Sequence, residues 1–408
     1  PASPSVDQVR TAQLVHGLLS DSRYAYRPRP LDAEMERDIV RRYLEALDSG
    51  KMFFTAADVA RFEPLAPELG MAVRKGQLEP AFAIFALYKE RVAERVEHSR
   101  ELLKQDIFDF TGDDRWEYDR KDAEWASDPA ELDALWRQSV RNDWLRLQLA
   151  GREPDKIRET LDRRYRNLAN NVAQLNGEDA FQSFLNAYTA SIDPHTDYFN
   201  PRSTQLFNQS MSLSLEGIGA QLQRQDDVIV IRELIAGGPA ALSGKFRVGD
   251  RIVGVGQGTD GPVEDVVGWR IDDVVDRIKG KAGSQVRLDV VPVEALLDSE
   301  PVRITLTRAK VRLEEQAAKS KVLDIPAGPA GDARRIGVIE LPAFYQDFEG
   351  RRSRNGDYAS ATRDVARILG EFRGKDLDGV VLDLRNNGGG SLNEAVELTG
   401  LFIDTGPV

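Results

Sequence analysis

Hydrophobic residues recur at helical spacing through the first half of the chain. The clearest case is residues 32–47, where apolar side chains three or four positions apart share one face: Met35, Ile39, Tyr43, Leu44 and Leu47. The same spacing predicts further helices over residues 82–92, 131–149, 156–175 and 178–190. Residues 108–125 are polar and aromatic without this period and predict a long loop. We therefore expect a helical N-terminal domain over residues 1–202.

Near residue 203 the pattern changes to short alternating apolar runs separated by glycine turns. Such runs predict β-strands, and they cover residues 217–222, 228–231, 248–255, 286–291 and 302–307. A short helix is expected after Pro239 and a second one over residues 271–278. Residues 203–310 therefore predict a β-rich domain with two helices, of ordinary domain size.

The last part of the chain predicts alternating strands and helices. We expect residues 311–334 to form a connector, with proline and glycine gathered in residues 326–331. Strands are then predicted over residues 335–344 and 380–384, the second buried on both faces, with a helix between them. Strand, helix and strand in this order favour parallel pairing. Two strands do not complete a sheet, so the fold class expected is multidomain α+β, with the incomplete beginning of an α/β core over residues 335–408.

Composition excludes several classes of function. The net charge of −12 argues against nucleic acid as a partner, and no apolar run reaches the length of a membrane span. Cysteine is absent, which excludes disulfides, thiolate metal sites and thiol catalysis, and which is compatible with an oxidising compartment. The three histidines, His16, His98 and His195, stand far apart in no metal-binding spacing. We expect no metal and no cofactor.

A glycine run follows the last predicted strand. Gly388, Gly389 and Gly390 precede Ser391, and Glu394 stands three residues after that serine, as in a capping box at a helix start. Bare amides at a helix N-terminus favour negative charge. A tight strand-to-helix turn explains the glycines equally well. The functional alternative is an oxyanion hole that uses the amide of Gly389 or Gly388. No serine stands in a Gly-x-Ser-x-Gly or Ser-x-x-Lys pattern that would mark a nucleophile.

A second glycine-containing loop opens the β-rich domain. It comprises Leu215, Glu216, Gly217, Ile218, Gly219 and Ala220, and Leu222 follows in the strand. Amides in such a loop can hold a terminal carboxylate, and an exposed strand edge can pair with a peptide. The loop alone is a weak signal. It becomes a strong one because residues 237–240 (Gly-Gly-Pro-Ala) and 248–255 (Val-Gly-Asp-Arg-Ile-Val-Gly-Val) follow it.

This order of motifs resembles the PDZ domain of bacterial carboxyl-terminal processing proteases. Together with residues 193–195, 211–220 and 383–390 it resembles the tail-specific protease family along nearly the whole chain. Residues 109–112 and 157–165 of the helical half fit the same family. The match is specific because several motifs recur in the same order at similar spacing.

The resemblance implies a periplasmic serine endopeptidase with a Ser–Lys dyad, acting on proteins with free apolar C-termini. The PDZ domain would hold the substrate with residues 215–222, and Gly389, or its neighbour Gly388, would supply one oxyanion donor. A periplasmic adaptor protein is a further candidate partner. The serine and lysine would lie after Val408, so we expect the chain as given to be inactive. The rival is a non-catalytic PDZ scaffold or adaptor that binds peptides, and a serine and a lysine encoded after Val408 would decide against it.

Overall fold

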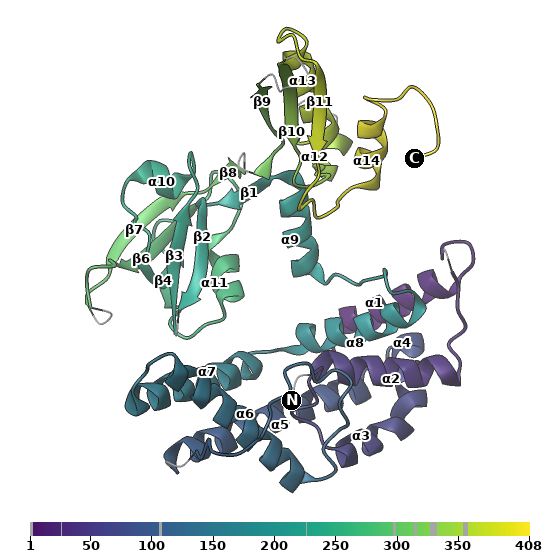
Figure 1. Cartoon of the computed structure of the whole chain (residues 1–408), viewed down its shortest axis with the longest axis vertical. Helices are drawn as coiled ribbons and strands as arrows, with labels where there is room; N and C mark the ends of the chain where they lie inside the picture. The colour runs from purple at the N-terminus through teal and green to yellow at the C-terminus, as the bar shows by residue number, and fades with distance from the viewer. Residues whose placement is uncertain are drawn as a thin grey trace. The chain divides into compact units, whose positions relative to one another are not determined.

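The computed structural model describes residues 3–25, 27–105, 108–225, 227–296, 299–313, 316–326, 333–353 and 358–408. These residues form two compact units, Pro1–Asn200 and Pro201–Val408. The first is called the helical unit below and the second the mixed unit. Figure 1 follows the chain through both of them.

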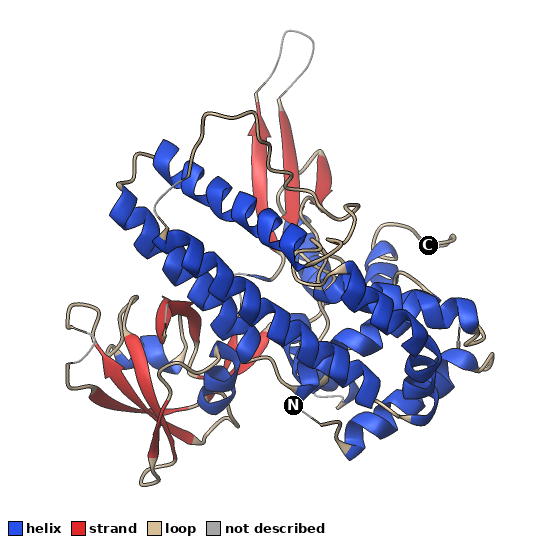
Figure 2. Cartoon of the chain, turned by 90° about the horizontal axis from the view of Figure 1, so that it is seen from below, coloured by secondary structure: helices blue, strands red, loops and turns tan. Residues whose placement is uncertain are grey.

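The helical unit consists of helices joined by loops, and Figure 2 shows them in blue. They are α1 (Val6–Ser20), α2 (Ala33–Leu47), α3 (Ala56–Phe62), the 3-10 turn η1 (Glu63–Leu65), α4 (Ala66–Lys75), α5 (Glu79–Lys104), α6 (Pro129–Leu149), α7 (Pro154–Ala173) and α8 (Gly177–Ile192). The helices predicted from periodicity are confirmed, although α5 runs well beyond the predicted residues 82–92. Residues 108–125 contain no helix, as the sequence predicts.

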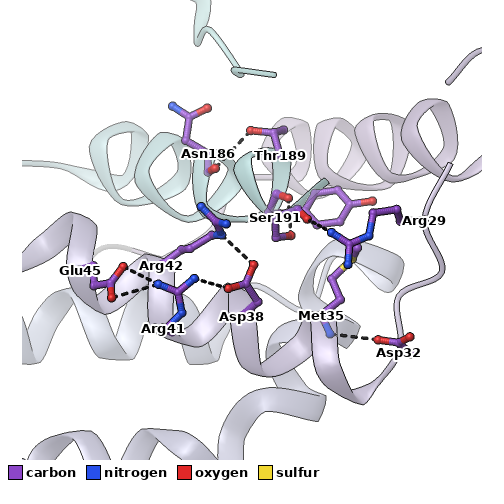
Figure 3. A network of polar contacts seen from close by, with 11 residues as sticks. Arg29, Asp32, Met35, Asp38, Arg41, Arg42, Glu45, Asn186, Thr189 and Ser191 are labelled. Atoms are coloured by element: carbon purple, nitrogen blue, oxygen red, sulfur yellow. Dashed lines mark hydrogen bonds and ion pairs between the residues drawn. The ribbon is translucent and has the colours of Figure 1, made fainter. Parts of the chain in front are cut away.

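Helix α2 shows why periodicity succeeds in this unit. Its predicted apolar face is buried, and the Tyr43 ring meets the edge of Phe184 on α8 with centroids 5.5 Å apart. The opposite face carries charges, where Asp38 pairs with Arg42 at 2.7 Å and also with Arg41 (Figure 3). A helix with one apolar and one charged face can be placed in only one way against a core.

The mixed unit begins with helix α9 (Pro201–Ser212), which the sequence analysis missed. Its Leu206 and Phe207 are exposed and only Met211 is buried, so no apolar stripe marks it as a helix. Strands β1 (Ser214–Gly217) and β8 (Ala309–Arg312) then pair as an antiparallel ribbon. In the sequence, β1 precedes the β-rich domain and β8 follows it.

The β-rich domain is an antiparallel sheet with two helices, as predicted. Its strands are β2 (Ala220–Gln225), β3 (Val228–Leu234), β4 (Arg251–Gln257), β5 (Val263–Asp265), β6 (Gln285–Val291) and β7 (Val302–Thr307), and its helices are α10 (Pro239–Ser243) and α11 (Ile271–Ile278). The sheet order is β2-β3-β4-β6-β7, with β5 attached to β4. Strand β2 therefore stands at one end of the described sheet, and α11 packs beside it (Figure 1).

A three-stranded sheet of order β11-β10-β9 follows. Its elements are β9 (Lys319–Ile325), β10 (Arg334–Glu340), α12 (Phe348–Arg352), α13 (Ala361–Phe372), β11 (Gly379–Asp383) and α14 (Leu392–Thr399). Strands β10 and β11 are parallel, as predicted from their crossover helix. Figure 2 shows the three strands in red, apart from those of the β-rich domain.

Two expectations for this region were wrong. The segment 311–334, predicted as a connector, contains β9, which pairs antiparallel with β10. Residues 314–315 and 327–332 of that segment lie outside the described residues. The strand expected to be buried on both faces has Val380 at 39% and Val381 at 50% exposure. In the described sheet β11 is an end strand, so it has a neighbour on one side only.

Across the described residues of both units, every helix is too short or too polar to span a lipid bilayer.

Candidate functional site

The glycine run forms the turn between β11 and α14. Gly390 has φ +143°, and a Cβ there would lie 2.3 Å from the carbonyl oxygen of Phe344, so only glycine fits. Gly389 has φ +89°, and a Cβ added at Gly389 or at Gly388 would meet no atom within 4 Å. The outer side of the turn at Gly388 and Gly389 is therefore open, while its inner side touches the chain at residue 344.

The segment that leads out of β10 holds this turn in place. The Phe344 N–H donates to the Gly389 carbonyl at 2.8 Å, and the Gly388 N–H donates to the Pro342 carbonyl at 3.2 Å. The Asn387 side-chain Nδ2 donates to the Leu341 carbonyl at 2.9 Å. Three hydrogen bonds thus connect the turn to residues 341–344, which are far away in sequence.

The two predicted oxyanion donors differ in what they bind in this structure. The Gly388 N–H is engaged by a main-chain carbonyl, as described above. The Gly389 N–H donates to the side-chain Oδ1 of Asn387 at 2.7 Å. The Asn387 side chain can rotate away by giving up its one other hydrogen bond described above, from Nδ2 to the Leu341 carbonyl, whereas a main-chain carbonyl in a paired segment cannot move without moving the segment. Of the two amides, that of Gly389 is therefore the easier one to offer to a ligand.

The predicted capping box is half right. Ser391 is the N-cap of α14, and its Oγ accepts from the Glu394 N–H at 3.5 Å. The Glu394 carboxylate does not return to the cap. It is fully buried, and its Oε2 accepts from Ser360 Oγ and from the Thr362 N–H, both at 2.8 Å. These two donors lie at the N-terminus of α13, so Glu394 joins the starts of two helices. Sequence analysis missed this role because the Ser-x-x-Glu pattern already had a local explanation.

The two serines of this network serve structure. Ser391 Oγ donates to Gln346 Oε1 at 2.9 Å, and Ser360 Oγ donates to Glu394 as described above. Both serines are buried. A buried hydroxyl cannot reach a substrate, so neither serine is placed to act as a nucleophile.

Charged residues surround the end of β11 just before the turn. Asp383 accepts from the Arg385 main-chain N–H at 3.0 Å and from its guanidinium at 2.7 Å. The Arg385 side chain, followed by its main-chain amide, lowers the pKa of Asp383 to about 2. A cavity of about 420 Å³ lies here, lined by Glu340, Leu341, Pro342, Asp383, Arg385 and Asn386 among others. The turn therefore lies beside an open, charged depression.

The second predicted site lies at the start of β2. The Ile218 carbonyl accepts from the Ala240 N–H at 2.8 Å, and the Gly219 carbonyl accepts from the Ile235 N–H at 2.9 Å. In a planar trans peptide the N–H points opposite to the C=O. The N–H groups of Gly219 and Ala220 therefore point away from residues 235–240. Because β3 continues into Ile235, the Ala220 N–H points to the side of β2 that has no neighbour in the described sheet.

Helix α11 lies along this edge of β2. Along β2 half-buried and exposed residues alternate, so Ala220 and Leu222 share the inner face. They pack with Val274 and Ile278 of α11 in one apolar cluster. The open edge of β2, the helix beside it and the two outward amides are together called the groove below. An open strand edge of this kind can pair with an extended peptide.

The structure divides the predicted peptide-binding residues into two groups. Ile218, Gly219, Ala220 and Leu222 lie at the groove. Leu215 and Glu216 belong to β1, which pairs with β8, and Glu216 Oε2 accepts from the Ala282 N–H at 3.3 Å.

Gly217 ends β1, and a Cβ added there would come within 3.8 Å of Lys279 at the end of α11. Gly219 has φ +72°, and a Cβ there would approach the Cα of Gly238 to 2.8 Å. The loop therefore requires glycine at position 219.

Three protein-family models match successive parts of the chain. The tail specific protease N-terminal domain matches residues 18–202, the PDZ domain residues 208–291, and peptidase family S41 residues 335–408. Their order is the order expected from the sequence motifs.

Curated relatives agree with these matches. The tail-specific protease of Haemophilus influenzae is 38% identical over 384 residues, which cover 94% of this chain and 52% of that protein. A probable CtpA-like serine protease of Staphylococcus aureus is 29% identical over 214 residues, covering 52% of this chain and 36% of that protein. The chain thus spans about half the length of the first relative and about a third of the second.

Two solved structures are similar to parts of the chain. The PDZ domain of a carboxy-terminal protease from Vibrio cholerae, solved in complex with peptide, is 56% identical and covers 25% of this chain and 100% of that one, with a TM-score of 0.24. The photosystem II D1 C-terminal processing protease is 25% identical and covers 63% of this chain and 60% of that one, with a TM-score of 0.27. Because three domain models match in this order and the Haemophilus relative matches along 94% of the chain, the chain belongs to the tail-specific protease family.

Proposed function

We propose that this chain is the substrate-binding part of a periplasmic serine-type endopeptidase that recognises proteins by free apolar C-termini. The observation that carries the proposal is the groove beside β2. There the Gly219 and Ala220 amides point outward at one end, and the apolar residues Ala220 and Leu222 line its floor. Amide donors bind a terminal carboxylate, and the apolar floor accepts an apolar last residue. The PDZ match over residues 208–291 supports the same assignment.

The test compares a peptide that ends in a free apolar residue with its C-terminal amide. Fluorescence anisotropy titration of the 408-residue chain should give about tenfold weaker binding for the amide, because a charge-assisted contact is lost. Gly219→Ala should abolish the difference, because its Cβ meets Gly238. Gly237→Ala is the matched control: Gly237 also has positive φ (+77°), but no atom lies within 4 Å of its Cβ position. Equal affinities for the acid and the amide would disprove carboxylate recognition.

The catalytic part of the proposal concerns the turn at residues 387–390. We assign the Gly389 N–H as one oxyanion donor, with Gly388 as the neighbouring alternative, and Asn387 Oδ1 must release that amide when a substrate carbonyl arrives. The nucleophilic serine and the lysine base belong to the family's C-terminal region, and the buried Ser360 and Ser391 of this chain do not replace them.

The 408-residue chain should therefore bind peptides without cleaving them. Mass spectrometry of a bound peptide after incubation checks this, and a cleaved product would overturn the assignment. A periplasmic adaptor protein is the further partner proposed on the family resemblance. Co-purification from a periplasmic extract tests both that partner and the location.

A further inference from the structure

The segment that leaves β10 runs beside the glycine turn and then along helix α14. As described above, residues 341–344 form hydrogen bonds with residues 387–389. Further along, the Ser391 N–H donates to the Phe344 carbonyl at 2.8 Å, and the Ser391 Oγ donates to Gln346. Later residues of the first segment thus meet later residues of the second.

An arginine holds the far end of this segment. Arg351, in α12, donates through Nη2 to Glu397 Oε1 at 2.7 Å, and its Nη1 lies 3.9 Å from Glu394 Oε1. Both carboxylates belong to α14. Residues 341–351, called the strap below, are therefore fixed to the glycine turn at one end and to α14 at the other.

The two carboxylates differ in how much they depend on Arg351. Glu397 is 46% exposed, so water can solvate its charge when the arginine is absent. Glu394 is 0% exposed, and its Oε1 has no hydrogen-bond partner among the described residues. In the same part of the chain, Arg351 is the cation paired with this oxygen. Leaving a buried charge without its partner costs far more than leaving an exposed one.

The shorter contact of Arg351 matters most for the arginine, and the longer one matters most for Glu394. The side-chain hydrogen bond with Glu397 is the largest cause that raises the pKa of Arg351, and the charge of Glu394 is the smallest. Arg351 is 37% exposed, so water can take the place of either carboxylate beside it. Water cannot take the place of Arg351 beside the buried Glu394, so the loss of the arginine falls on that carboxylate.

Glu394 is connected to the glycine turn through the cap of α14. Its N–H donates to Ser391 Oγ at 3.5 Å, and Ser391 follows Gly390 directly in the chain. Its carboxylate also holds the start of α13, as described above. A displacement of Glu394 by an uncompensated charge would therefore move the start of α14, and with it the Gly389 N–H.

We propose that Arg351 is a positioning residue of the oxyanion turn, acting as the counter-ion of the buried Glu394 carboxylate. It fixes the strap to α14 and so holds the Gly389 amide where a substrate carbonyl would meet it. The inference rests on the proposed function, because the Gly389 amide is the oxyanion donor assigned there.

The first test measures how the loss of Arg351 depends on the charge of Glu394. Hydrogen exchange of residues 391–399 in the 408-residue chain should be roughly tenfold faster in Arg351→Gln than in the unaltered chain. In a Glu394→Gln background, the same substitution should change exchange less than about twofold, because no buried charge remains.

Two control variants accompany this test. Glu397→Gln should accelerate exchange less than about threefold, because its pair is exposed and Arg351 can then turn fully toward Glu394. Arg352→Gln is the matched control for Arg351→Gln, because it removes the same charge from the neighbouring exposed position on α12. It should leave the exchange of α14 unchanged.

Salt concentration distinguishes the two carboxylates independently. Exposed charge pairs are screened at high ionic strength, whereas buried charges are screened much less. The acceleration caused by Arg351→Gln should therefore largely persist at about 1 M salt. An acceleration that came from the exposed pair with Glu397 would disappear there.

The second test follows the proposed donor itself. In a nitrogen–proton correlation spectrum of the deuterated chain, the Gly389 amide resonance should move in Arg351→Gln. It should return toward its original position in Arg351→Lys, which restores the charge. In Arg352→Gln and Glu397→Gln it should stay in place.

Three results would overturn the inference. The first is equal acceleration by Arg351→Gln in the unaltered chain and in the Glu394→Gln background. The second is an effect of Glu397→Gln as large as that of Arg351→Gln, which would assign the strap to the exposed pair. The third is a Gly389 resonance that does not move in Arg351→Gln, which would limit the arginine to the stability of α14.

These outcomes are separate from those that decide the proposed function. Equal binding of a free C-terminus and its amide would disprove carboxylate recognition at the groove, which none of these substitutions touches. Thermal melts by circular dichroism establish that each variant is folded. Should the double variant not fold, the comparison of Arg351→Gln with Glu397→Gln, the salt dependence and the Gly389 resonance still decide.

Discussion

Glu394 offers the sharpest test of how the glycine turn is held. Its carboxylate is 0% exposed, and Oε2 accepts two hydrogen bonds from the first turn of α13. Glu394→Ala removes the acceptor and leaves the Thr362 N–H and the Ser360 hydroxyl buried without it. A hydrogen bond to a charged group contributes about 1.5–3 kcal/mol. The desolvation cost of the buried carboxylate, which the variant relieves, offsets part of this.

The expected net loss for Glu394→Ala is about 2–4 kcal/mol in the local opening free energy of α13 and α14. In Glu394→Gln the amide oxygen can keep both hydrogen bonds, so the loss should be about 1 kcal/mol. Glu397→Ala is the matched control. Glu397 stands on the same helix and pairs with Arg351 at 2.7 Å, but it is 46% exposed and should cost less than about 1 kcal/mol.

Hydrogen exchange followed by mass spectrometry measures these losses locally, which suits a chain of several domains that need not unfold in one step. Peptides covering residues 360–372 and 391–399 should exchange roughly 30-fold to 1,000-fold faster in Glu394→Ala. Equal acceleration in Glu394→Ala and Glu397→Ala would refute the bridging role. So would a Gln variant as damaged as the Ala variant.

Two further predictions concern the same turn. Gly390→Ala should destabilise the turn by at least about 2 kcal/mol, because its Cβ would lie 2.3 Å from the Phe344 carbonyl oxygen. The Cβ of Gly388→Ala meets no atom within 4 Å, so that variant should cost little. Hydrogen exchange of residues 384–399 compares the stability of the two variants. The carboxyl pKa of Asp383 is lowered to about 2 mainly by the Arg385 side chain, so its stabilising contribution is complete above about pH 4 and is lost as pH falls toward 2. Arg385→Gln should raise that pKa toward its ordinary value in an NMR titration, and an unchanged midpoint would contradict the assigned cause.

Much of the architecture was predictable because it depends on local periods. Residues 32–47 and 271–278 form helices whose apolar stripes are visible in the sequence. Parallel pairing of β10 and β11 followed from the helix between them. Helix α9 was not predicted because it does not have to bury a full apolar face: Leu206 and Phe207 remain exposed. Its sequence therefore lacks the regular apolar spacing that marks the other helices. Strand β9 was not predicted because it is an end strand whose residues are mostly exposed, so apolar and polar residues do not alternate clearly along it.

The sequence by itself determined where the chain turns and which residues can carry chemistry. Glycines 219, 389 and 390 mark backbone conformations with positive φ that other residues rarely adopt, and that requirement is local. Only the tertiary structure decided what each of these groups meets. Asn387 donates to the Leu341 carbonyl, Glu394 joins two helix starts, and Ala220 presents its amide at an open strand edge. Hydrogen-bond partners are chosen by proximity in space, and chain segments far apart in sequence come close only when the cores between them pack.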